Sequence, residues 1–274
     1  MSYYPLLKAP GCKSWTSLCN FAPNNWEDKV ITKKQINVTW ADGGKWHSRN
    51  IGELNENEIQ TIDESEISDY MPDTALPLLS LCNGSLPETS TELPQVKSTT
   101  VMPAWRASLG LSTNKTSTSY QGEIDPFPTP GTLLTFSPFL QFEKEIENYM
   151  ILLNIEKSPN QRTSVVEAYD STKTTLKAKF DIKNNAANII VLDDLGFLED
   201  DLVLTVCREM CAIPLYVSKT SDGAFMSMEH THPPASFAIH GNRWGVQKVL
   251  KDLWFKKTEH EKDNLENKKS TLDI

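Results

Sequence analysis

The stretch TSVVEAYDSTKTTLKAKFDIK, residues 163–183, decides the fold class. It contains two runs, 163–170 and 176–183, that alternate between apolar and polar side chains over much of their length. Ser171 and Thr172, which follow Asp170, are typical turn residues. Two alternating runs that flank a polar turn predict a pair of antiparallel strands with one wetter face.

The same rhythm continues on both sides of this pair. Nine strand-like runs, most of them separated by turn residues, follow one another without a long helix between them: 132–142, 146–156, 163–170, 176–183, 189–192, 202–207, 213–219, 224–232 and 235–240. Short strands at this spacing indicate an all-β architecture, whereas alternating helices would indicate a parallel sheet. We therefore expect an antiparallel β-sandwich of the jelly-roll or immunoglobulin-like type.

After the last run the apolar period changes from two to about 3.6 residues. In the segment 244–255, Val246, Val249, Leu250, Leu253 and Trp254 fall on one face of a helix, and Asn242 is a candidate N-cap. We expect one C-terminal amphipathic helix whose apolar face packs on the sandwich.

The first part of the chain predicts a smaller β-rich region. Residues 35–40 alternate in period two, Ala41-Asp42-Gly43-Gly44 is a turn signal, and 45–51 can return as the partner strand. The acidic segment 55–70 has only a loose helical stripe, and 83–119 is rich in Ser, Thr and Pro. The expected organisation is a β-rich region with an acidic segment (1–82), a connector (83–119), the sandwich with its helix (120–257) and a charged tail (258–274).

Charge and cysteine content narrow the class of protein. The formal net charge is −9 and the isoelectric point is near 5.1, which disfavours nucleic acid as a partner. Ten acidic residues and no Lys or Arg lie between Asn50 and Val96, so the rest of the chain is nearly neutral. Five cysteines and no apparent signal peptide or membrane span predict a soluble, cytoplasmic protein with reduced thiols.

A histidine cluster is the strongest candidate for chemistry. His230 and His232 are two residues apart on an expected strand, so their imidazoles project from one face, and His240 reaches that face if the turn after Pro233 has the right register. Three neutral imidazoles suit a divalent metal such as zinc or iron, with Glu229 as a fourth ligand or general base. In the alternative interpretation these histidines only order a turn at the edge of the sheet.

Two pairs of aromatic and basic residues are candidates for ligand binding. Trp105-Arg106 and Arg243-Trp244 could stack on sugar rings or planar ligands, or the tryptophans could fill an interface between domains.

Three functions are compatible with these patterns. The first is a non-catalytic binding or accessory protein whose ligand is carbohydrate or another protein. It is favoured because the sequence contains no phosphate-binding glycine loop, nucleophile elbow or His-Glu-x-x-His motif. The second is a metal-dependent hydrolase or oxygenase that uses the histidine cluster. The third is a structural or assembly subunit.

Overall fold

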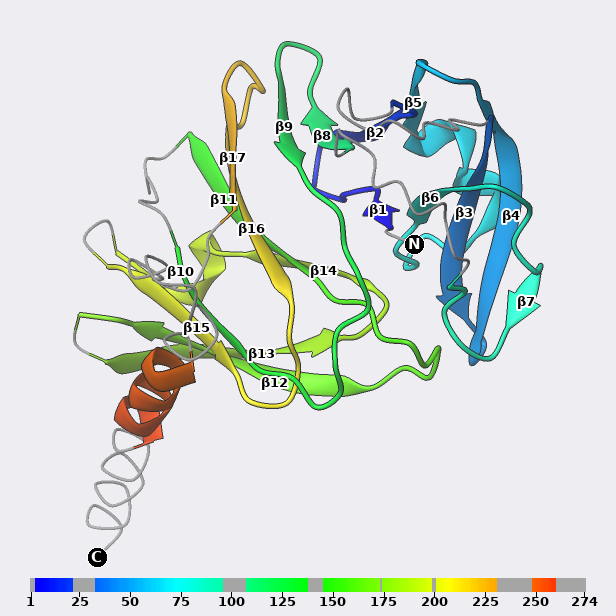
Figure 1. Cartoon of the computed structure of the whole chain (residues 1–274). Coiled ribbons are helices and arrows are strands. Elements are labelled where there is room, and N and C mark those ends of the chain that lie inside the picture. Colours follow the sequence, from blue (N-terminus) through cyan, green and yellow to red (C-terminus); the bar gives the residue numbers. More distant parts are fainter. Residues whose placement is uncertain are drawn as a thin grey trace, which may run out of the picture.

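A computed structural model describes residues 3–21, 33–95, 107–137, 145–172, 174–198, 201–230 and 248–259. Its architecture is mainly β, with four antiparallel sheets and one C-terminal helix (Figure 1). The predicted fold class is therefore confirmed at this level. No helix within these ranges is long and apolar enough to cross a membrane. All five cysteines are free thiols, as their number suggested.

Four sheets lie one after another across the molecule, from sheet 1 at the N-terminal side to sheet 4 beside the C-terminal helix (Figure 1). Sheet 1 has the order β1-β6-β3-β4-β7, with β1 Tyr4–Pro5, β6 Leu78–Cys82, β3 Lys34–Asp42, β4 Lys45–Leu54 and β7 Thr89–Ser90. Sheet 2 has the order β5-β2-β8-β9, with β5 Ile59–Asp63, β2 Lys13–Cys19, β8 Ser108–Ser112 and β9 Ser117–Gln121. Sheet 3 has the order β14-β11-β16-β17, with β14 Ala187–Val191, β11 Ile146–Leu153, β16 Ile213–Thr220 and β17 Met226–His230. Sheet 4 has the order β10-β15-β12-β13, with β10 Leu133–Phe136, β15 Val203–Cys207, β12 Thr163–Asp170 and β13 Thr175–Lys183. Three 3-10 helices, η1 Glu64–Glu66, η2 Ser68–Tyr70 and η3 Asp193–Leu195, lie in the loops.

Sheet 3 is the middle layer, because both faces of β11 are buried. Tyr149, Ile151 and Leu153 belong to a core shared with sheets 1 and 2. Met150 and Leu152 belong to a second core shared with sheet 4. Successive side chains of a strand point to opposite faces, so a continuous apolar run is what a two-sided buried strand requires. The apolar run 149–153 of β11 is therefore buried on both faces.

The C-terminal helix, residues 248–259, covers the outer face of sheet 4 (Figure 1). Trp254 and Phe255 pack there against Leu134 and Tyr169. The predicted apolar face is wrong in part, since Val249 and Leu253 are 59% and 58% exposed. Trp254 belongs to the expected stripe and does meet the sheet, but the neighbouring Phe255 packs there with it while Leu253 faces solvent.

The N-terminal hairpin matches its prediction. Strands β3 and β4 pair through a turn at Gly43 and Gly44, whose φ angles of 55° and 73° are those that glycine tolerates best. The acidic segment is not the loose helix that its apolar spacing indicated. Residues 59–63 form β5, and two single-turn 3-10 helices follow, because Asp63 and Glu66 form a capping box around η1.

Part of the Ser/Thr/Pro-rich stretch is strand rather than loop. Strand β8 pairs with both β2 and β9, and its Leu109 and Leu111 are buried in the N-terminal core. Sheet 2 therefore contains strands from both sides of the segment 96–106, which lies outside the described residues.

Sheets 2 and 3 are joined where β9 runs beside β17 (Figure 1). At the hairpin tips, Lys115 Nζ lies 2.8 Å from Asp222 Oδ2, and Thr113 Oγ1 donates to the carbonyl of Gly223 at 2.7 Å. These contacts join the β8–β9 hairpin to the β16–β17 hairpin.

Candidate functional site

The exposed face of sheet 2 begins with the alternation of β2. Ser14, Thr16 and Leu18 are buried, and Thr16 Oγ1 donates to the carbonyl of Pro5 at 3.1 Å, so these side chains face the N-terminal segment beneath the sheet. Lys13 and Trp15, the strand neighbours of Ser14, therefore project from the opposite face.

Trp15 occupies the centre of this face and lies flat on the backbone of Gly110. The two residues are directly paired between β2 and β8. A Cβ atom placed on Gly110 would lie 2.1 Å from both Cε2 and Cζ2 of Trp15 and 2.6 Å from Cδ2. These three ring atoms are adjacent, and their distances from the Cβ position of Gly110 are similar. That position therefore lies beneath the plane of the indole, because an edge-on approach would leave the third atom much further away. The indole thus has one face against glycine, and the absent side chain of Gly110 is what makes room for it.

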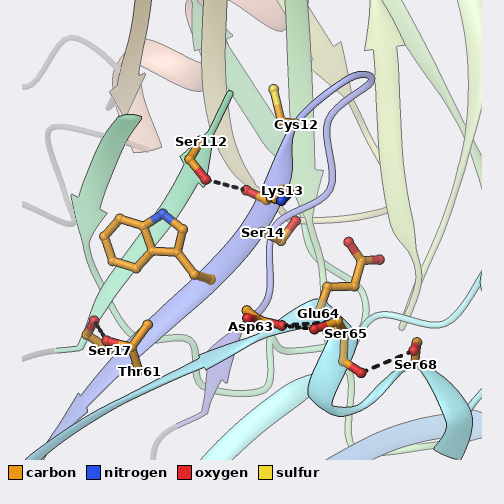
Figure 2. A pocket seen from close by; sticks show the side chains of 11 residues that line it. Cys12, Lys13, Ser14, Ser17, Thr61, Asp63, Glu64, Ser65, Ser68 and Ser112 are labelled. Atoms are coloured by element: carbon orange, nitrogen blue, oxygen red, sulfur yellow. Dashed lines mark hydrogen bonds between the residues drawn. The ribbon is translucent and has the colours of Figure 1, made fainter. Parts of the chain in front are cut away.

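A groove of about 810 Å³ lies over this part of sheet 2 and is called the Trp15 groove below. Six of its eleven lining residues carry a hydroxyl: Ser14, Ser17, Thr61, Ser65, Ser68 and Ser112. Figure 2 shows that they come from two sides, the strands β2, β5 and β8 and the loop of η1 and η2. The groove therefore combines several short hydroxyl side chains with a single large aromatic ring.

Hydrogen bonds hold these hydroxyls in place. Ser17 Oγ and Thr61 Oγ1 are 2.6 Å apart, and Ser112 Oγ donates to the carbonyl of Lys13 at 3.4 Å (Figure 2). A hydroxyl that donates one bond keeps lone pairs that can accept others. The groove can accordingly offer both donors and acceptors to a polyhydroxylated ligand.

Asp63 is the carboxylate paired directly with Trp15 across β5 and β2. Hydrogen bonds from the side chain and backbone of Ser65, together with the charge of Lys13, lower the pKa of Asp63. Asp63 consequently remains an anion and accepts hydrogen bonds only. Burial raises the pKa of the Cys12 thiol at the end of the groove, so this residue is a neutral thiol rather than a nucleophilic thiolate.

The serines of the groove differ in their hydrogen-bond partners. The Ser14 hydroxyl donates to the carbonyl of Leu7, and the Ser68 hydroxyl donates to the carbonyl of Ser65, so neither is bonded to a general base. The Ser65 hydroxyl donates to Oδ1 of Asp63. None of the eleven lining residues is a histidine.

The predicted metal site is only partly described. The imidazole of His230 lies 5.0 Å from the ring of Tyr120 on β9, on the side of β17 that faces the N-terminal core. Glu229 is exposed. It directly precedes His230 in β17 and therefore projects from the opposite face, so these two side chains do not converge. Within the described ranges no three His, Cys, Asp or Glu side chains are grouped as a metal site would require.

The other candidates lie outside the residues that the structure describes. These are the metal-ligand candidates His232 and His240 and the ligand-binding candidates Trp105, Arg106, Arg243 and Trp244. The histidine triad and the two aromatic and basic pairs remain predictions.

Sequence reasoning did not single out Trp15. The available signal is the segment KSWTSLC, residues 13–19, in which a tryptophan alternates with Ser and Thr on a strand. What the sequence does not contain is the pairing of Trp15 with Gly110, 95 positions away, which makes the ring lie flat.

Comparisons of the chain with protein-family models, curated proteins and solved structures found no match.

Proposed function

We propose that the chain is a non-catalytic binding protein, built on a β-sandwich, whose Trp15 groove binds carbohydrate. The single observation that carries this proposal is the indole of Trp15, which lies flat over Gly110 in a groove lined by the hydroxyl residues Ser17, Thr61 and Ser112.

This combination matches the two-sided chemistry of a sugar ring. A pyranose has a face of C–H bonds, which favours the electron-rich face of an indole, and a rim of hydroxyls. A ring held flat presents that face with little conformational freedom to lose on binding. Ser17, Thr61 and Ser112 surround Trp15 within the groove and can hydrogen-bond to the rim.

The same features favour carbohydrate over a protein partner. The centre of a protein interface is an apolar, water-excluding patch with several large side chains. Here, one aromatic ring is surrounded by short polar side chains, and the outward-facing Ser117 and Ser119 of β9 extend the polar surface.

The sandwich part of the proposal concerns sheets 3 and 4. Leu152 of sheet 3 and Val166 of sheet 4 belong to one core, and the strands within each sheet are antiparallel. Two antiparallel sheets that bury a common face-to-face core are the defining feature of a sandwich.

Binding of the full-length protein to a glycan array, followed by titration of the best ligand, tests the function. We expect the wild type to bind at least one saccharide class and Trp15→Ala to lose at least tenfold in affinity. Phe225→Ala is the matched control, since Phe225 is an exposed aromatic residue that does not line the groove, and it should bind like the wild type.

Two results would overturn the proposal. One is a wild-type protein that binds no glycan. The other is unchanged affinity in Trp15→Ala. In the second case, loss of binding in Trp105→Ala or Trp244→Ala would place the ligand at the residues predicted from the sequence.

A further inference from the structure

We infer that Asp63 makes the Trp15 groove selective for uncharged saccharides, and that it excludes acidic sugars. This inference rests on the proposed carbohydrate binding and adds the class of saccharide and the residue that selects it.

The position of Asp63 carries the argument. Because Asp63 and Trp15 are directly opposite in the β5 and β2 pairing, their Cβ atoms are about 5 Å apart on one face of the sheet. Both residues line the groove. A sugar stacked on the indole would therefore place its hydroxyl rim beside the carboxylate of Asp63.

The carboxylate of Asp63 retains capacity to accept a further hydrogen bond. Oδ1 accepts the backbone N–H of Ser65 at 2.8 Å and its hydroxyl at 2.5 Å, and the side chain also accepts the backbone N–H of Glu66 in the capping box. An ionised carboxylate has about four lone-pair sites and no proton, so one site remains for a ligand hydroxyl and no hydrogen can be donated to a second carboxylate.

The surrounding charges act in the same direction. Glu64 also lines the groove, and Glu66 and Asp69 follow in η1 and η2. Nearby cations include Lys8, which is bound to Glu64 at 3.3 Å, Lys13, which lines the groove, and Arg49, which lies over the ring of Tyr70 in η2. The acidic segment thus contributes more negative than positive charge to this rim, and an anionic ligand would approach against it.

A purely structural role for Asp63 is separable from this one. Asp63 is the N-cap of η1, and Asn caps a helix about as well as Asp does. Asp63→Asn therefore retains the cap and the shape of the side chain while it removes the charge. Stability should hardly change, so any change in ligand preference reports on recognition.

The experiment compares three series of oligosaccharides on the wild type, Asp63→Asn and Asp69→Asn. The probes are glucose and galactose oligomers, their 2-amino counterparts, and the matching glucuronic and galacturonic acid oligomers. Asp69→Asn removes one charge from the same segment at an exposed position that does not line the groove, so it controls for the general potential.

We expect the wild type to bind a neutral oligomer at least tenfold more tightly than the acidic counterpart. Asp63→Asn should weaken the neutral ligand about tenfold and reduce the discrimination, while Asp69→Asn should behave like the wild type. Equal or better binding of the acidic series by the wild type, or unchanged selectivity in Asp63→Asn, would overturn the inference and leave carbohydrate binding intact. Absence of binding to all three series, or binding that Trp15→Ala does not weaken, would overturn both proposals.

Discussion

The indole N–H of Trp46 donates a hydrogen bond of 2.9 Å to the carbonyl oxygen of Lys157, which lies 111 positions further along the chain. The same carbonyl accepts the backbone N–H of Leu93 at 2.8 Å. Trp46 is buried in the core that also contains Ile151 and Leu215 of sheet 3. The N-terminal sheets and sheet 3 are therefore joined by a common apolar core and by a shared polar contact.

Trp46→Phe should lower the free energy of unfolding by about 1–2 kcal/mol. The substitution removes the hydrogen bond and some ring volume, but the Lys157 carbonyl keeps its bond from Leu93, so it is not left without a partner. Trp46→Ala should cost about 3–5 kcal/mol because it also leaves a cavity. Urea denaturation followed by circular dichroism measures both. Equal stability of Trp46→Phe and the wild type would show that this contact contributes nothing.

Glu147 should make the stability of the protein depend on acidic pH. Hydrogen bonds from Lys219 and Tyr149 lower the pKa of this carboxyl group below its usual value of 4.5. Lys219 is buried beside it. A carboxyl whose pKa is lower in the folded state stabilises the protein above its unfolded-state pKa, and this contribution is lost as the pH falls through the folded-state value.

We therefore expect Glu147→Gln to be less stable than the wild type at pH 7 and to lose less stability between pH 5 and pH 2. Thermal unfolding across this pH range measures the difference. Glu229→Gln is the control, because Glu229 is exposed and forms no ion pair within the described ranges. Parallel stability curves for Glu147→Gln and the wild type would contradict the assignment.

Many of the strands were predictable from the sequence because alternation within a strand and the turn residues at its ends are local features. Strand β12 coincides with the run 163–170, and the turn at Gly43-Gly44 is marked by residues that tolerate positive φ. The burial of β8 was not predictable in this way. Its Leu109 and Leu111 are set among Ser, Thr and Pro, and only pairing with β2 from the start of the chain gives them a core to join.

The candidate site was largely inaccessible to sequence reasoning for the same physical reason. The groove depends on long-range register, which places Trp15 between Asp63 and Gly110. The uneven charge was visible in the sequence, but only the fold brings part of the acidic segment, through Asp63 and Glu64, to the rim of the groove. Sequence patterns favoured clustered histidines, because a short spacing is recognisable without knowledge of strand pairing.

Arg208→Ala should loosen the C-terminal helix. Arg208 donates to the buried Glu167 at 2.8 Å and to Thr258 at 2.8 Å, and its guanidinium lies 5.3 Å from the ring centre of Phe255. Without Arg208 the buried carboxylate of Glu167 loses a cationic partner that adds to its ion pair with Lys179 and its hydrogen bond from Tyr169, so we expect a loss of about 2–3 kcal/mol.

Hydrogen exchange measured by mass spectrometry tests this prediction. Peptides that cover 248–259 should exchange faster in Arg208→Ala, whereas peptides from β3 and β4 should be unchanged. Arg49→Ala is the control, since Arg49 lies over the ring of Tyr70 and belongs to β4, a strand on the other side of the molecule from the helix (Figure 1). Unchanged protection of the helix would show that Trp254 and Phe255 alone hold it on sheet 4.

The contact between Trp15 and Gly110 makes a prediction that does not depend on any ligand. In the wild type, Gly110→Ala brings a methyl group against the indole face and should cost about 1–3 kcal/mol of stability. In a Trp15→Ala background the same substitution should cost nothing or stabilise by up to about 1 kcal/mol, because alanine restricts the unfolded chain more than glycine does. Gly52→Ala, whose new methyl group would meet only Ile36 at 3.9 Å, is the matched control and should have the same effect in both backgrounds. Urea denaturation of the four variants in the cycle gives the coupling between positions 15 and 110. A coupling near zero would mean that the ring does not lie over Gly110 in solution, and the aromatic surface on which the groove depends would be lost with it.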